Sequence, residues 1–117
     1  MTASSEGPRG TGDLGHGEVW WADIDKIRPV VVLTRRRVAS RLRRILVAPV
    51  TTTVRGLSTE VTLGEPEGLK SGCVANLDNV QLIPASTLLR RAGFVDPARW
   101  HEFCGAMMSV MACSLAA

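Results

Sequence analysis

Apolar residues are sparse before Gly17 and recur regularly after it. Residues 1–16 (MTASSEGPRGTGDLGH) are rich in Gly, Ser, Thr and Pro and offer almost nothing to bury, which predicts a disordered N-terminal leader. Beyond it, apolar or alternating runs rich in β-formers recur, each about as long as one strand. The predicted strands are 18–24, 28–34, about 43–49, 58–63, 73–77 and 79–83. Strands this short and this closely spaced favour a small closed or nearly closed antiparallel barrel, with Pro49 expected at the end of the third strand.

The pattern near the C-terminus is helical. Asp96 is a good N-cap and Pro97 suits the first helical position, so we expect a helix from about residue 97. One apolar stripe continues at helical spacing, made of Trp100, Phe103, Met107, Val110 or Met111, and Ser114. Such a helix packs on the barrel or on a partner subunit. The segment 86–91 is compatible with a further short helix.

Length and charge fit one small basic domain over residues 17–117. The chain has 117 residues, is 45% hydrophobic and carries a formal charge of +3, which permits an anionic partner without requiring one. No apolar run is long enough to cross a bilayer, so we expect no membrane association. The three cysteines are odd in number and lack metal-ligand spacing, which favours a reduced, cytoplasmic setting and no metal site.

Six arginines fall between Arg35 and Arg44. A run of this kind is most often a solvated loop and edge strand, where charge also blocks edge-to-edge association. Contact with RNA or with an acidic protein is the alternative, and it would supply affinity and salt dependence rather than base choice.

Four segments then occur in a specific order: GEVWWADI (17–24), RPVVVLT (28–34), VAPVTTTVRG (47–56) and GCVANLDNVQLI (72–83). Together they resemble the MazF/PemK family of toxin ribonucleases, over nearly the whole predicted domain. The resemblance implies a mainly β, SH3-like antiparallel barrel of the CcdB/PemK type with a C-terminal helix, assembled as a homodimer. It also implies a cytoplasmic endoribonuclease that needs no cofactor and no metal. The implied partner is a MazE-like antitoxin whose acidic C-terminal segment covers the RNA groove.

The resemblance implies that Arg28 and Thr51 are catalytic. RNA can be cut without a metal because its own 2′-hydroxyl attacks the adjacent phosphorus, giving a 2′,3′-cyclic phosphate and a 5′-hydroxyl end. A guanidinium grips phosphate oxygens with paired donors, and a hydroxyl can donate one more hydrogen bond to the same group. We expect single-stranded or loop RNA (messenger, ribosomal or transfer) as substrate. The expected RNA-binding residues are Lys26, Arg35, Arg36, Thr52, Thr53, Arg55 and Asn76.

Two departures from the family pattern stand out. The loop DIDKI (23–27) is shorter than usual and holds no glutamate, which bears on how it gates the site. Cys73 replaces a polar residue and is most simply a small buried side chain.

Other interpretations stay open at this point. Thr51–Thr53 can be a strand end that caps its own backbone, and Arg28 can be an exposed residue before a strand. At the level of function, the alternatives are a CcdB-like toxin that binds gyrase and a non-catalytic basic barrel that binds RNA.

Overall fold

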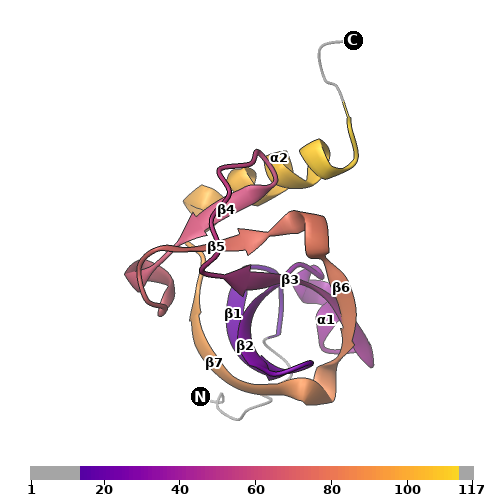
Figure 1. Cartoon of the computed structure of the whole chain (residues 1–117). Coiled ribbons are helices and arrows are strands. Elements are labelled where there is room, and N and C mark those ends of the chain that lie inside the picture. Colours follow the sequence, from indigo (N-terminus) through magenta and orange to yellow (C-terminus); the bar gives the residue numbers. More distant parts are fainter. Residues whose placement is uncertain (1–13, 114–117) are drawn as a thin grey trace.

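One curled antiparallel sheet forms the body of the protein in the computed structural model, which describes residues 14–113. Its strands are β1 (Glu18–Asp23), β2 (Ile27–Val32), β3 (Arg44–Thr51), β4 (Glu60–Leu63), β5 (Cys73–Asn76), β6 (Gln81–Pro84) and β7 (Leu88–Phe94). They pair in the order β4-β5-β3-β2-β1-β7, and β6 pairs with β3. Figure 1 shows β7, β1, β2, β3 and β6 curling into a ring, with β4 and β5 between this ring and helix α2 (Trp100–Val110). The predicted barrel is therefore an incompletely closed one, a half-barrel.

Most of the segment 86–91, compatible with a helix from its sequence, belongs instead to the strand β7, which begins at Leu88. A short 3-10 turn, η5 (Ala85–Thr87), precedes it. β7 pairs antiparallel with β1, with Trp20 opposite Arg91 and Trp21 opposite Arg90. Local propensity does not decide such a segment, because the pairing with β1 provides hydrogen-bond partners that the sequence window does not contain.

Strand β3 continues through Pro49 to Thr51, two residues beyond the predicted end. One edge of β3 pairs with β2, and its other edge changes partner along its length. β6 pairs with β3 as far as Val47, and β5 takes over from Val50. Pro49 lies in the gap between these two partners, so its missing N–H removes no hydrogen bond from that edge.

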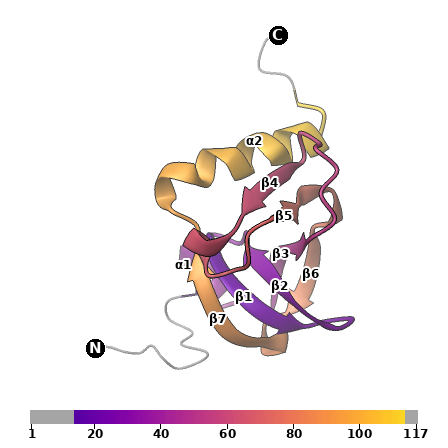
Figure 2. The same ribbon diagram turned by 60° about the vertical axis from the view of Figure 1, so that its left-hand side comes forward.

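Successive residues of β2 and β3 serve two separate cores, which explains their uninterrupted apolar runs. Val31 and Val50 belong to a cluster that also contains Phe103 and Ala106 of α2. Val30 and Val47 belong to a second cluster, together with Trp20 and Ile83. Figure 2 shows the same arrangement from the side, with α2 lying over β4. A strand buried on both faces loses the alternation that marks a half-exposed one.

The folded domain begins before Gly17. Leu14 is 6% exposed and packs in the second core, and the His16 ring lies 5.1 Å from that of Trp100. Residues 14–16 are thus packed, contrary to the predicted leader over 1–16. The rest of that predicted leader, residues 1–13, lies outside the described residues.

Helix α2 starts much as its sequence indicated. The Asp96 carboxylate accepts a hydrogen bond from the Ala98 N–H, and a 3-10 turn, η6 (Pro97–Arg99), leads into the helix. Phe103 and Ala106 are buried against the sheet. Within residues 14–113, no helix combines the length and apolarity needed to cross a membrane.

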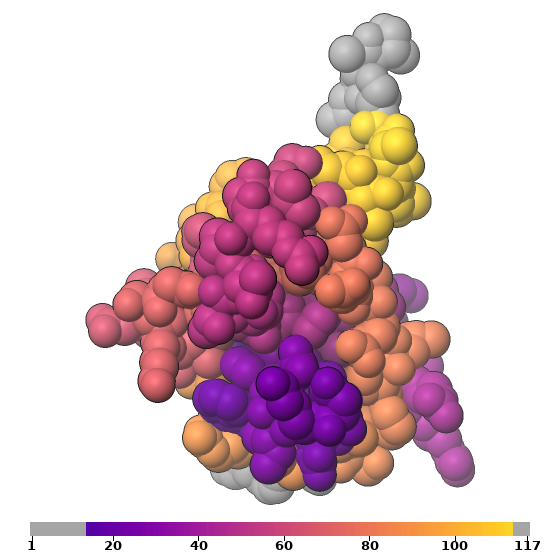
Figure 3. Space-filling model, in the orientation of Figure 1, coloured from indigo at the N-terminus to yellow at the C-terminus, as the bar shows by residue number. Residues whose placement is uncertain are grey.

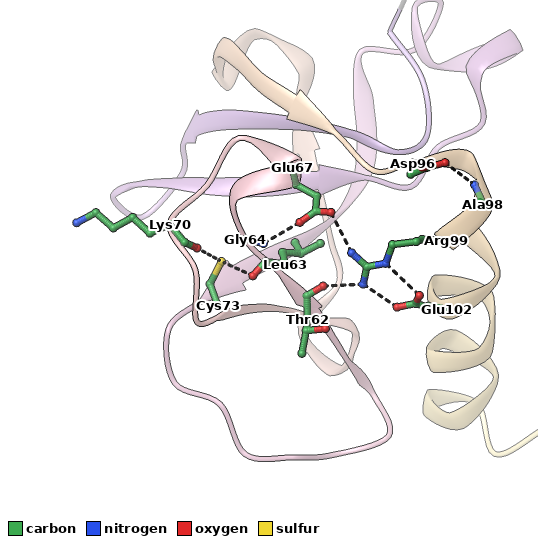
Figure 4. A network of polar contacts seen from close by, with 10 residues as sticks. All are labelled: Thr62, Leu63, Gly64, Glu67, Lys70, Cys73, Asp96, Ala98, Arg99 and Glu102. Atoms are coloured by element: carbon green, nitrogen blue, oxygen red, sulfur yellow. Dashed lines mark hydrogen bonds and ion pairs between the residues drawn. The ribbon is translucent and has the colours of Figure 1, made fainter.

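Arg99 ties α2 to the sheet through a network of polar contacts (Figure 4). Its guanidinium donates to the Glu67 carboxylate at 2.9 Å, the Thr62 carbonyl at 2.8 Å and the Glu102 carboxylate at 2.7 Å. Glu67, at the end of the 3-10 turn η3 (Glu65–Glu67), is 2% exposed and also accepts the Gly64 N–H at 2.7 Å. The buried carboxylate is thus paired and hydrogen-bonded, as a buried charge must be.

Candidate functional site

Arg28 and Thr51 lie at the same end of neighbouring strands and on the same face of the sheet. Antiparallel pairing of β2 with β3 sets Val30 opposite Pro49. Pairing of β2 with β3 ends at this pair, and Arg28 and Thr51 each lie two residues beyond it. Because side chains alternate between the two faces of a strand, both residues belong to the same face as Val30, which packs in the second core.

Arg28 is held by the short loop between β1 and β2. Its Nη2 donates to the Asp25 carboxylate at 2.9 Å, and its side chain is 25% exposed. Its Nε is buried and has no hydrogen-bond partner among residues 14–113. An orphaned buried donor of this kind costs roughly 1–3 kcal/mol.

Asp25, which binds Arg28, is not among the residues predicted from the sequence. The slight burial of its carboxyl raises its pKa, but the backbone N–H groups of Asp25 and Lys26 and the Arg28 guanidinium outweigh this and hold the pKa below its ordinary value. Asp25 therefore stays ionised and acts as the counter-ion of Arg28. The signal was present as an i, i+3 spacing of opposite charges, which is common in any loop.

The Thr51 hydroxyl accepts a hydrogen bond within its own turn and donates none within the described residues. Its Oγ1 accepts the Thr53 N–H at 3.0 Å, so the alternative of a self-capping strand end is correct for this one bond. Within the described residues the hydroxyl donates no hydrogen bond, which leaves its proton for another acceptor. Thr51 is partly exposed, and pairing with Val74 of β5 fixes its backbone.

The predicted RNA-binding residues Thr52, Thr53, Arg55 and Lys26 are all exposed, and they lie in the loops that follow β3 and precede β2. Figure 3 shows that the β1–β2 hairpin, in indigo and violet, lies against the magenta segment after β3 on one face of the molecule. Lys26 belongs to the loop before Arg28, and Arg55 belongs to the segment that follows Thr51.

Asn76 is less available to bind RNA, because its side-chain carbonyl oxygen already accepts a hydrogen bond. Its Oδ1 accepts the Asp78 N–H at 2.9 Å and caps the 3-10 turn η4 (Leu77–Asn79). Asp78 in turn accepts the Thr59 hydroxyl at 2.6 Å. The amide NH₂ of Asn76 is what could reach RNA.

The structure does not bring Arg35 and Arg36 to the pair. They follow the end of β2, whereas Arg28 lies at its start, so a six-residue strand about 20 Å long separates them. Arg36 donates to the buried Glu18 carboxylate at 2.8 Å, beside a cavity of about 540 Å³ at the opposite end of the sheet. A role for these two arginines in RNA binding stays a prediction, and it would have to act away from the reacting phosphate.

Cys73 is a buried thiol, as expected. Its Sγ lies 3.2 Å from the Lys70 carbonyl and 3.5 Å from the Leu63 carbonyl. Burial, together with the negative charge of Glu67, raises the pKa of the thiol above its ordinary value. It therefore stays protonated and fills space. No group of three or more His, Cys, Asp or Glu that could hold a metal occurs within residues 14–113.

Comparisons with known proteins agree with this geometry. The family model of the PemK-like, MazF-like toxin of type II toxin–antitoxin systems matches residues 16–111. The probable endoribonuclease MazF5 of Mycobacterium tuberculosis is 43% identical over 102 residues, which are 84% of this chain and 93% of that protein. The solved structure of the Mycobacterium tuberculosis toxin MazF-mt6 aligns with a TM-score of 0.80 at 37% identity, over 83% of this chain and 98% of that one.

A further solved structure is an endoribonuclease in complex with its cognate antitoxin, from a mycobacterial species. It aligns with a TM-score of 0.77 over 86% of this chain and 97% of that one. At 22% identity this likeness shows the fold alone.

The half-barrel with a helix across one end is thus the fold of a MazF-type toxin. The chain belongs to the PemK-like, MazF-like toxin family of type II toxin–antitoxin systems. The family predicted from the sequence is therefore confirmed, and so is the mainly β fold with a C-terminal helix. The curated relatives are named endoribonucleases, which supports the predicted enzyme class. Neither the gyrase-binding toxin nor the non-catalytic barrel finds support.

Proposed function

We propose that this chain is a toxin endoribonuclease that cleaves RNA with Arg28 and Thr51 and without a metal ion. The reaction is attack of the RNA 2′-hydroxyl on the adjacent phosphorus. The bond from phosphorus to the 5′ oxygen breaks, leaving a 2′,3′-cyclic phosphate and a 5′-hydroxyl end. The observation that carries the proposal is that these two residues belong to one face of the curled sheet, each two residues beyond the last pair of β2 with β3.

Each residue has a distinct task in this reaction. The Arg28 guanidinium binds non-bridging phosphate oxygens with paired donors and stabilises the negative charge that builds up there. Because a guanidinium in a protein stays protonated, Arg28 can deliver a proton to the leaving oxygen more readily than it can remove one from the nucleophile. Thr51 donates a hydrogen bond from its hydroxyl to the same phosphate. The hydrogen bond that the hydroxyl oxygen accepts from the Thr53 N–H orients the side chain and leaves the hydroxyl proton available.

The substrate we propose is a single-stranded or looped segment of RNA, because in-line attack needs a flexible backbone that a duplex resists. Lys26 and Arg55 would hold the flanking phosphates, and Thr52, Thr53 and the Asn76 amide the neighbouring polar groups. The Arg28–Asp25 ion pair must open or turn for the phosphate to enter, and this is inexpensive because Asp25 is exposed.

The partners we propose are a second copy of this chain and a MazE-like antitoxin with an acidic C-terminal segment, in the cytoplasm. Large apolar side chains support a protein contact here, since Ile27, Val54 and Leu57 are 59%, 52% and 48% exposed beside the basic residues. An acidic segment would compete with RNA for Arg28 and Arg55. The antitoxin complex of the related endoribonuclease is a precedent for such a partner.

A pair of threonine variants tests the site. Thr51→Val keeps the shape of the side chain but removes the hydroxyl, and we expect about a hundredfold loss of kcat on a single-stranded RNA in excess EDTA. Thr51→Ser keeps the hydroxyl and should lose only severalfold. Mapped cleavage ends should carry 5′-hydroxyl groups. A Thr51→Val protein that cleaves as fast as wild type would remove Thr51 from the mechanism.

A matched pair of arginine variants tests the guanidinium. Arg28→Lys keeps the positive charge but loses the paired N–H donors of the guanidinium, and it should abolish nearly all cleavage. Arg37→Lys makes the same change in the exposed α1 segment (Arg36–Ala39), at the other end of β2, and should cleave like wild type. Equal losses in the two variants would mean that arginines act through general RNA affinity, contrary to the proposal.

A further inference from the structure

The loop after Thr51 is wrapped around one carboxylate, that of Glu60. The three consecutive N–H groups of Arg55, Gly56 and Leu57 lie 3.1, 2.9 and 3.2 Å from Glu60 Oε1, and the Arg55 N–H also lies 3.3 Å from Oε2. Gly56 has φ +72°, the left-handed conformation that turns successive N–H groups toward one point. Such a concave arrangement of N–H groups binds anions, and here the chain itself supplies the anion.

Glu60 is well placed to hold this loop because its own backbone is fixed. It is the first residue of β4, opposite Asn76 of β5, and its N–H donates to the Leu57 carbonyl at 3.1 Å. The loop is thus clamped at both ends by side chains, by Thr51 on Thr53 and by Glu60 on residues 55–57. Between these clamps the residues are exposed and have little other packing.

We propose that Glu60 is a positioning residue for RNA cleavage: its carboxylate fixes the loop that carries Arg55 and follows Thr51. The inference rests on the proposed function of this site. Glu60 acts through the backbone and need not touch RNA. Without its acceptor, the three N–H groups turn to water and the loop samples many conformations, so Arg55 and the turn that orients Thr51 lose their fixed geometry. Misplacement by about 1 Å is enough to slow a positioned reaction up to a hundredfold.

Whether cleavage becomes slower or faster when Glu60 is replaced distinguishes a positioning role from a purely electrostatic one. A carboxylate near a phosphate-binding face repels RNA, so a residue acting only by charge would bind RNA more tightly once neutralised. Glu60→Gln and Glu60→Ala remove the same charge. Only Glu60→Gln keeps a carbonyl oxygen that can accept the three hydrogen bonds.

The experiment measures kcat and KM for a single-stranded RNA with wild type, Glu60→Gln, Glu60→Ala and the control Glu65→Ala, which removes an exposed glutamate of η3. We expect kcat/KM to fall by at least about tenfold in Glu60→Ala, to stay within about threefold of wild type in Glu60→Gln, and to be unchanged in Glu65→Ala. Thermal unfolding identifies any loss due to misfolding, which we expect to be small because the loop is exposed. Equal losses in both Glu60 variants, or faster cleavage in either, would overturn the proposal.

Amide hydrogen exchange tests the clamp apart from activity. We expect the Gly56 amide to exchange at least tenfold faster in Glu60→Ala and close to the wild-type rate in Glu60→Gln. If exchange follows this pattern while Thr51→Val still cleaves normally, the proposed function fails but the clamp stands. If exchange at Gly56 does not change in Glu60→Ala, the positioning role is wrong.

Discussion

Replacing Arg99 with methionine should destabilise the protein strongly, although Arg99 is itself partly exposed. Met keeps much of the apolar stem of the side chain but leaves the Glu67 carboxylate, whose side chain is 3% exposed, without its cation. Removing one partner of a buried ion pair costs about 3–5 kcal/mol. Glu67 keeps the Gly64 N–H, and Arg99 is 28% exposed, so we expect the low end, about 3 kcal/mol.

Thermal unfolding by circular dichroism and urea unfolding provide the assay, at one fixed protein concentration because association shifts apparent stability. For a domain of about 100 residues, 3 kcal/mol corresponds to a fall in Tm of about 15 °C. Glu102→Gln breaks the ion pair of the same arginine with a more exposed carboxylate and is the matched control. It should cost only about 0.5 kcal/mol.

A second substitution tests the reason for the loss. In the Arg99→Met background, Glu67→Gln removes the unpaired buried charge and can still accept the Gly64 N–H, so it should restore most of the lost stability. The reasoning is refuted if Arg99→Met is no less stable than Glu102→Gln, or if Glu67→Gln destabilises the Arg99→Met protein further.

Two further predictions concern the same region. Gly68 and Gly72 have φ +85° and +84°, but a Cβ on Gly68 would lie 2.1 Å from the Ala92 carbonyl oxygen, whereas one on Gly72 meets nothing within 4 Å. In both alanine variants the left-handed backbone costs about 1 kcal/mol of stability. Gly68→Ala should cost about 2 kcal/mol more, because the end of η3 and β7 must move apart to admit the methyl group. Equal midpoints of urea unfolding for the two variants would contradict this close approach. The hydrogen bond from Arg99 lowers the pKa of Glu102 below its ordinary value of 4.5, burial opposes this, and the charges of Arg99 and His101 add to the lowering. The stability contributed by Glu102 is therefore present above about pH 4.5 and is lost as the pH falls through the lower pKa of the folded state. The free energies of unfolding of wild type and Glu102→Gln should accordingly converge as the pH is lowered. A difference between them that grows on acidification would refute the assignment.

Most of the strands, the capped start of the C-terminal helix and the family could be predicted from the amino-acid sequence. These features are local: β-branched runs, Asp96 before Pro97, and four short segments in a fixed order are all contained in the chain as written. The assignment of Arg28 and Thr51 to one site followed from the family pattern and not from local chemistry, because 23 positions separate the two residues.

Tertiary structure alone decided what depends on contacts between distant segments. β7 is a strand because β1 pairs with it, and Pro49 is tolerated within β3 because β6 ends where β5 begins. The arginines from Arg35 onward look adjacent to the site in sequence, yet the length of β2 carries them to the opposite end of the sheet. Glu60 shows the same limit, since no side-chain pattern reveals a carboxylate that binds backbone N–H groups. A backbone donor exists at nearly every residue, so only the folded path of the loop shows which ones converge.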